Sequence, residues 1–232
     1  MNPWQKQQWC IGTLDGTYIA RMEAILDLYA EPPDPARPVV CLDEYAYSLQ
    51  AAVRDPLPAQ PGQVARVDYE YERCGGCSLF MLFDRHAGWR RVTVSEQRTK
   101  RELAEQLRIL VEEVYPQAKC IRVVLDNLNT HTLGALYEHF PAHQAHAIAA
   151  KLELHYTPVH GSWLNMIEIE WSVLARQCLG RPLAAIATVQ AECDAWAARR
   201  NAEHATVNWR FTTADARQRF RRLYPTTTAD AS

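Results

Sequence analysis

HYTPVHGSWLNMIEIEWSVLARQCL, residues 155–179, is the stretch around which the rest of this chain can be arranged. It opens like the end of a strand, turns at Pro158, and continues into a helix with carboxylates in its first two turns. Two upstream strand-like runs finish in aspartate, PVVCLDEY at 38–45 and CIRVVLDNLNTH at 120–131. Two aspartates and a glutamate brought together in this way predict a metal-dependent phosphoryl-transfer site.

Length and composition indicate one or two globular domains with a real core, since 48% of the 232 residues are apolar and 22% are charged. The net charge of -2 does not by itself indicate a nucleic-acid binder, although a whole-chain average can hide local patches. Seven cysteines, several in apolar runs, are typical of reduced thiols in a cytosolic protein. No apolar run is long enough for a membrane helix, so we expect no membrane association.

The first half of the chain predicts one helix followed by strands. Apolar residues recur at helical spacing in 18–29, and the tract EPPDPARP at 31–38 then breaks regular structure. The strand-like runs lie at 38–43, 66–73, 78–83 and 89–96. The glycines of CGGC at 74–77 indicate a hairpin turn between two of these runs. No second CxxC or HxxxH pair accompanies this motif, so a zinc site is disfavoured.

The second half predicts helices alternating with strands. Thr99 and Glu102 form a capping box before an amphipathic helix that ends near Pro116. The later strands are expected at 120–125 and 151–156, and the later helices at 133–150 with a break near Pro141, in the organising stretch, at 182–200 and from Thr213.

The resulting order, β-β-β-α-β-α-β-α, is that of an α/β, ribonuclease-H-like fold with a mixed five-stranded sheet flanked by helices. We expect three parts: an N-terminal linker and helix at 1–37, a catalytic domain at 38–201 and a basic tail at 202–232. In this fold the strands that lead to Asp43 and Asp126 are neighbours, so the two carboxylates should converge.

Helical periodicity leaves the third acid open. The helix buries a stripe of Leu164, Ile167, Trp171, Leu174 and Cys178. At about 100° per residue, Glu168 and Glu170 flank this stripe on opposite sides. Either could face the end of the sheet, and the other would be a solvated charge.

A family resemblance chooses between them. Asp126-Asn127 with His131, followed by YTPVHGSWLNMIEIEW at 156–171, resembles the catalytic core of DDE transposases of the Tc1/mariner–IS630 superfamily, most of all the IS630 type. The resemblance implies that Asp43, Asp126 and Glu168 are the catalytic acids and the metal ligands.

The same resemblance implies the activity: Mg²⁺-dependent cleavage and strand transfer of an insertion sequence. Two Mg²⁺ ions are implied, with Mn²⁺ able to substitute for them. The implied partners are transposon-end and target DNA, together with a second copy of the chain in an active homodimer. The implied location is the bacterial cytoplasm, in association with the nucleoid. Such transposases also carry an N-terminal helix-turn-helix region, which we do not find in this sequence.

Six further residues are candidates for supporting the site or contacting DNA: His131, His160, Asn165, Trp163, Arg217 and Arg221. His131 could orient a phosphate or a metal-bound water, or make a structural hydrogen bond. Trp163 could stack on a base or belong to the core. Arginines gather in 85–101 and 199–222 and suit DNA phosphates, although both segments could be ordinary solvated faces. Glu44 is left out because it follows Asp43 on the opposite strand face.

Two other functions stay open at this point. The chain could be a non-catalytic DNA-binding or assembly remnant of a transposase. It could also be a host ribonuclease-H-like nuclease that cuts branched DNA or RNA–DNA hybrids.

Overall fold

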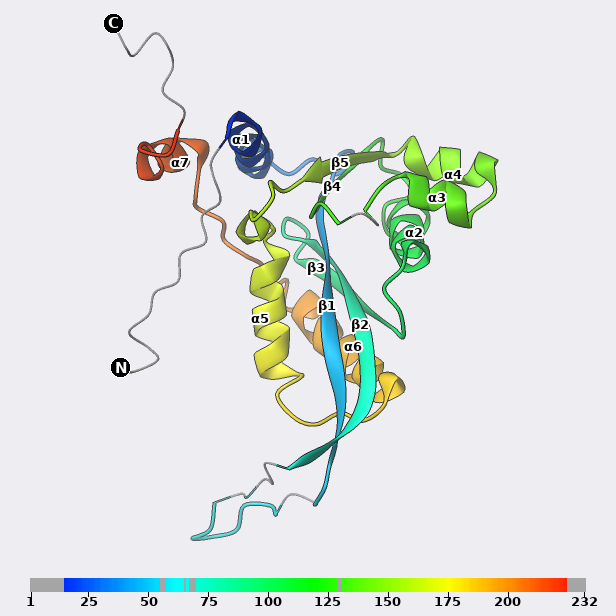
Figure 1. Cartoon of the computed structure of the whole chain (residues 1–232), viewed down its shortest axis with the longest axis vertical. Helices are drawn as coiled ribbons and strands as arrows, with labels where there is room; N and C mark the ends of the chain where they lie inside the picture. The colour runs from blue at the N-terminus through cyan, green and yellow to red at the C-terminus, as the bar shows by residue number, and fades with distance from the viewer. Residues whose placement is uncertain (1–14, 55–56, 65, 67–69, 129–130, 225–232) are drawn as a thin grey trace, which may run out of the picture.

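A five-stranded mixed sheet forms the centre of the chain, in a computed structural model that describes residues 15–54, 57–64, 66, 70–128 and 131–224. The strand order is β3-β2-β1-β4-β5 (Figure 1). The strands are β1 (Val39–Ala52), β2 (Tyr71–Asp84), β3 (Trp89–Ser95), β4 (Ile121–Leu125) and β5 (Leu152–Tyr156). The pairs β1–β2 and β2–β3 are antiparallel, whereas β1–β4 and β4–β5 are parallel. The expected ribonuclease-H-like class is confirmed.

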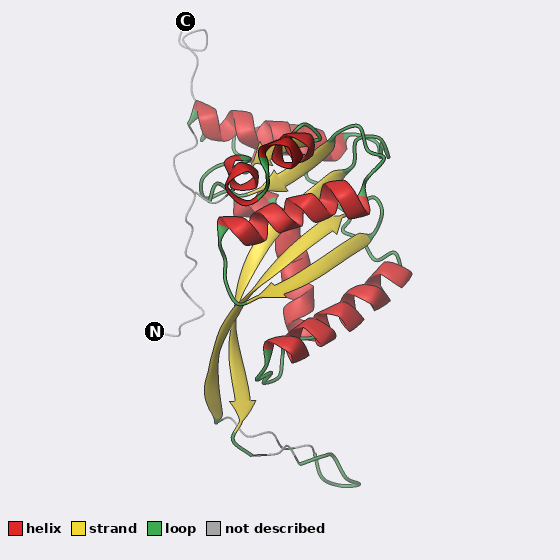
Figure 2. Cartoon of the chain, turned by 90° about the vertical axis from the view of Figure 1, so that its right-hand side faces the viewer, coloured by secondary structure: helices red, strands yellow, loops and turns green. Residues whose placement is uncertain are grey.

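Helices cover both faces of this sheet (Figure 2). One face packs against α1 (Gly16–Ala30), α5 (Ile167–Gln177) and α6 (Ile186–Ala202), with the short 3₁₀ turn η3 (Ser162–Leu164). The other face packs against α2 (Lys100–Arg108), its π-helical continuation η2 (Ile109–Val114), α3 (Gly134–His139) and α4 (Ala142–Ala149). Strand alternation explains the two cores, since Val39 and Cys41 enter the first while Val40 and Leu42 enter the second.

The predicted start of α2 is confirmed in detail. Thr99 caps the helix, and its backbone N–H donates to Oε2 of Glu102 at 2.9 Å, which completes a capping box. Leu103 and Leu107 are fully buried on one face of this helix. A cap and an apolar stripe together therefore locate the helix correctly from sequence.

The predicted hairpin at CGGC is wrong, because β2 runs straight through these residues. Gly75 has a φ of 100°, and the register of β1 with β2 shifts between Ser48 and Gln50, so the glycines serve an irregularity inside a strand. The connection between β1 and β2 lies at 53–70 instead. The strand predicted at 38–43 is also too short, since β1 continues to Ala52 and projects with β2 as a two-stranded arm (Figure 1).

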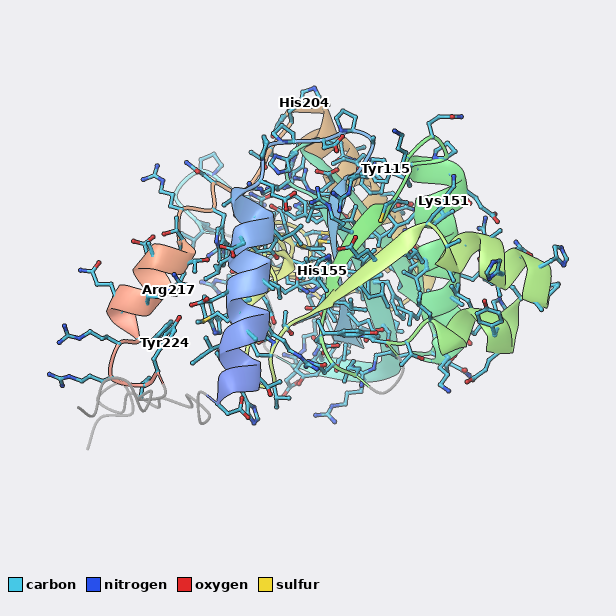
Figure 3. All side chains as sticks on the ribbon, turned by 90° about the horizontal axis from the view of Figure 1, so that it is seen from above. Tyr115, Lys151, His155, His204, Arg217 and Tyr224 are labelled. Atoms are coloured by element: carbon cyan, nitrogen blue, oxygen red, sulfur yellow. The ribbon has the colours of Figure 1, made fainter. Side chains whose placement is uncertain are left out.

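Helix α7 (Thr213–Arg219) packs against α1, as Figure 3 shows near Arg217 and Tyr224. Arg217 forms a two-pronged ion pair with Glu23, at 2.8 and 2.7 Å. Helix α1 itself belongs to the core: Met22 is fully buried, and the Tyr29 hydroxyl donates to the carbonyl oxygen of Leu164 at 2.9 Å.

The division into 1–37, 38–201 and 202–232 stays a prediction, and residues 1–14 and 225–232 lie outside the described residues. Among the helices that the structure describes, none combines the length and the apolar character needed to cross a membrane.

Candidate active site

Asp43 and Asp126 occupy equivalent positions on neighbouring parallel strands. The β1–β4 ladder pairs Cys41 with Val124, and two further residues along each chain bring Asp43 opposite Asp126. Asp126 follows the last residue of β4, whereas Asp43 lies within β1, just beyond the part that pairs with β4. Since adjacent strands lie about 4.8 Å apart, the backbone holds the two aspartates side by side.

The start of α5 is tied to the strand that carries Asp43. The side-chain amide of Asn165 donates to the carbonyl oxygen of Leu42 at 3.0 Å, and both residues are buried. The backbone N–H of Glu168 donates to the carbonyl oxygen of Asn165 at 3.1 Å. Asn165, a predicted site residue, therefore anchors the turn that presents Glu168.

Burial and neighbouring carboxylates both shift the pKa of Asp43. Burial is the largest influence that raises the pKa of Asp43, and the negative charges of Glu168, Asp126 and Glu44 raise it further, to about 7. The backbone N–H of Glu44 donates to Oδ1 of Asp43 at 2.8 Å and opposes this rise only in part. The three acids predicted from sequence thus share one electrostatic site.

The pKa of Asp126, in contrast, is lowered. Burial works to raise its pKa, but hydrogen bonds from His131 and from the backbone N–H of Leu128 outweigh it and leave the pKa below its usual value. The Nδ1 atom of His131 lies 2.6 Å from Oδ1 of Asp126, and the N–H of Leu128 donates to the same oxygen at 3.1 Å. The predicted candidate His131 therefore contacts Asp126 directly.

Glu44 is the residue that the sequence analysis missed. Its side chain is 1% exposed, and its Oε1 lies 3.0 Å from Nε2 of His131. Alternation along β1 correctly separates Glu44 from Asp43, but the loop after β4 brings His131 to it. The sequence signal that could have found Glu44 is the combination of an Asp-Glu step in one predicted strand with a DNxxxH element that follows the neighbouring strand.

Glu170 is a structural acid, and the expectation that the second glutamate is a solvated charge is wrong. Its side chain is 1% exposed and lies between two arginines. Its Oε2 is 3.0 Å from Nε of Arg90 on β3, and its Oε1 accepts from Nη2 of Arg200 on α6 at 2.7 Å. Glu168 is exposed and influences Asp43 instead.

The remaining candidates lie in different surroundings. His160 is exposed, with a φ of 62°, in the loop between β5 and η3. Trp163 is 39% exposed, donates to the Tyr18 hydroxyl at 3.2 Å and packs edge-on against Phe211. The guanidinium of Arg217 is already paired with Glu23, whereas Arg221 is exposed. Both arginines are exposed, and among the described residues an acidic partner is seen for Arg217 alone of the two.

The two arginine-rich segments are partly committed to internal contacts. In 85–101, Arg90 is buried against Glu170, and Arg91 and Lys100 pair with Glu113 and Glu138. In 199–222, exposed arginines remain at positions 210, 219, 221 and 222. The basic surface is therefore smaller than the sequence count suggests.

The donor set suits a hard divalent cation, because carboxylate oxygens are the ligands that Mg²⁺ prefers. Burial is the main cause of the raised pKa of Asp43, and repulsion from neighbouring carboxylates adds to it. A bound cation would offset both effects by favouring the charged carboxylate. Within the described residues, no three His, Cys, Asp or Glu side chains are already gathered in metal-binding geometry.

Comparison with known proteins places this geometry in context. A profile of the family described as DDE superfamily endonuclease matches residues 38–190. The Mos1 mariner paired end complex with Mn has a TM-score of 0.55 at 15% identity, covering 94% of this chain and 64% of that chain. A pre-cleavage Mos1 transpososome has a TM-score of 0.53 at 14% identity, covering 94% and 65%. The chain thus spans just under two thirds of these structures. No curated protein matches significantly.

Proposed function

The chain belongs to the DDE superfamily endonuclease family, and from that premise we propose that it is the catalytic domain of an IS630-type transposase. It would cleave DNA strands at the ends of an insertion sequence in a divalent-metal-dependent reaction and join the freed 3′ ends to target DNA. The observation that carries this proposal is the side-by-side placement of Asp43 and Asp126 on the paired strands β1 and β4. The negative charge of Glu168 adds to the burial that raises the pKa of Asp43.

In the proposed site, Asp43 and Asp126 hold one cation jointly, and Glu168 completes the coordination of a second. Two Mg²⁺ ions held there would activate the attacking oxygen and stabilise the leaving oxygen, and Mn²⁺ would substitute for them. The protein's own part is positioning. Asn165 fixes the turn before Glu168, and the β1–β4 ladder fixes the backbone of the two aspartates.

DNA is the proposed partner, both as transposon end and as target, with a homodimer as the active complex. The Mos1 structures named above are a paired end complex and a transpososome, which supports this assignment. Exposed arginines of the tail, Arg221 among them, would contact DNA phosphates and make binding weaken as salt rises. The proposed setting is the bacterial cytoplasm, in association with the nucleoid.

The test is nicking of supercoiled plasmid by the purified chain, with Mg²⁺ or Mn²⁺ and with EDTA as the blank. Asp43→Asn, Asp126→Asn and Glu168→Gln should each abolish metal-dependent nicking. Glu203→Gln removes an exposed carboxylate at the end of α6 and should leave nicking unchanged.

Two results would replace the proposal. DNA binding without any nicking would identify a non-catalytic remnant. Cleavage confined to RNA–DNA hybrids or branched DNA would identify a host nuclease.

A further inference from the structure

A buried histidine joins two carboxylates that come from different strands. His131 is completely buried, with Nδ1 2.6 Å from Oδ1 of Asp126 and Nε2 3.0 Å from Oε1 of Glu44. Nδ1 also lies 3.2 Å from the backbone carbonyl oxygen of Asp126. The imidazole therefore bridges the carboxylate of Glu44 on β1 and Asp126 at the end of β4.

Resting on the function proposed above, we propose that Glu44 and His131 are positioning residues that select which oxygen of Asp126 faces the metal. Glu44 holds the imidazole, and the imidazole occupies Oδ1 of Asp126. Oδ1 also accepts from the N–H of Leu128 at 3.1 Å, so its lone pairs are committed. Oδ2 is left for the cation.

The surroundings hold Glu44 and His131 in place. The Glu44 side chain is 1% exposed and that of His131 is fully buried. The Tyr156 hydroxyl donates to the carbonyl oxygen of His131 at 2.7 Å, and the N–H of His131 donates to the carbonyl oxygen of Leu128 at 2.9 Å. Buried charges persist only when paired, so removing one member leaves the next uncompensated.

The position of Asp126 explains why its carboxylate needs a neighbouring residue to orient it. It stands one residue beyond β4, and 32% of its side chain is exposed, so the strand fixes its backbone but not its carboxylate. A carboxylate that must bind a cation with one defined oxygen benefits from a neighbour that fixes its rotation. That neighbour is His131, and Glu44 contacts its other ring nitrogen, Nε2. Among the residues that the structure describes, the second oxygen of Glu44, Oε2, accepts no hydrogen bond, and Nε of Arg98 lies 3.9 Å from it.

The experiment measures Mn²⁺ binding by the full chain, from the electron paramagnetic resonance signal of free Mn²⁺, alongside nicking as a function of Mn²⁺ concentration. Glu44→Gln removes the charge behind His131 while keeping its shape. It should raise the Mn²⁺ concentration for half-saturation roughly 10- to 100-fold in both assays. Nicking at saturating Mn²⁺ should approach the wild-type rate.

His131→Gln and His131→Ala provide the second test, and they decide the matter if Glu44→Gln does not fold. The Gln amide can still donate to Oδ1 of Asp126, so His131→Gln should bind Mn²⁺ more tightly than His131→Ala. The double variant Glu44→Gln/His131→Gln should bind Mn²⁺ about as weakly as the weaker single variant, because the two residues act as one unit.

A purely structural role would give a different result. Glu44→Gln would then lower the midpoint of thermal unfolding and leave the Mn²⁺ half-saturation unchanged, and this outcome overturns the inference. Asp126→Asn separates it from the function itself. If Asp126→Asn still nicks DNA, the proposed catalytic site is wrong. If Asp126→Asn is dead and Glu44→Gln binds Mn²⁺ normally, only the positioning role fails.

Discussion

The side-chain amide of Asn165 donates to the carbonyl oxygen of Leu42 at 3.0 Å, which joins the start of α5 to the residue before Asp43. This single contact links two parts of the site that are far apart in the chain. Asn165→Ala should cost about 1–3 kcal/mol of unfolding free energy, because it leaves a buried carbonyl oxygen without a donor. It should also slow nicking, since Glu168 loses its anchor. Urea denaturation and plasmid nicking measure the two effects. Asn208→Ala, at an exposed position, should change neither.

Glu168 and Glu170 should separate activity from stability. Glu170→Gln should lower the unfolding free energy by about 3–5 kcal/mol, because it leaves the buried guanidinium of Arg90 without a full counter-charge. Glu168→Gln, at an exposed position, should change the unfolding free energy by less than about 0.5 kcal/mol and abolish nicking. Denaturation and nicking of the two variants in parallel provide the measurement. The reverse pattern would make Glu170 the third acid of the site.

Acid should loosen the contact between α7 and α1. Hydrogen bonding to Arg217 is the main reason why the pKa of Glu23 lies below its usual value. The contribution of this pair to stability is therefore present above the pKa of Glu23 in the unfolded chain, about 4.3, and is lost as the pH falls through the lower folded value. Unfolding free energy measured between pH 6 and pH 3, roughly across this titration, should fall more steeply in wild type than in Glu23→Gln. Equal slopes would contradict this role of Glu23.

The two glycines of CGGC should differ in what they tolerate. Gly75 has a φ of 100°, so Gly75→Ala should cost about 1–2 kcal/mol of unfolding free energy. Gly76 has no positive φ, and an added Cβ would lie 3.4 Å from the carbonyl oxygen of Tyr47, an ordinary contact. Gly76→Ala is therefore the matched control and should cost less. Thermal unfolding of both variants checks the difference.

Cys74 tests whether CGGC binds metal. Its thiol is exposed, while Cys77 is buried. Because the glycines serve a strand irregularity, Cys74→Ser should leave the thermal unfolding midpoint unchanged, and so should a chelator. A chelator-induced fall in the midpoint that Cys74→Ser abolishes would establish a structural metal at this position.

Local patterns predicted most of the architecture. The buried stripe on α5, the cap of α2 and the order of strands and helices all follow from periodicity and turn chemistry within short windows. The strand-leading runs before Asp43 and Asp126 did predict their convergence, because the fold class fixes which strands are neighbours. The local prediction that failed is the hairpin turn at CGGC. These glycines lie within a long strand and accommodate an irregularity in it.

Non-local partners account for the rest. Helical geometry alone does not decide whether Glu168 or Glu170 is the third acid. The arginines that pair with Glu170 come from β3 and α6, outside its own helix. Strand alternation places Glu44 on the face opposite Asp43. No residue near Glu44 in the sequence indicates its contact with His131, which is 87 residues away. Whether a charged side chain is buried and paired depends on which distant element packs against it. A periodic pattern in the sequence does not contain that information.

The parallel pairing of β1 with β4 also sets when the protein can act. It joins Val39 to Arg122, so the two aspartates meet only after a long crossover has closed. Contacts of this kind form slowly in folding, because the loop entropy must be overcome before the pairing contributes any stability. A newly made chain therefore does not assemble the proposed site until β1 and β4 have paired.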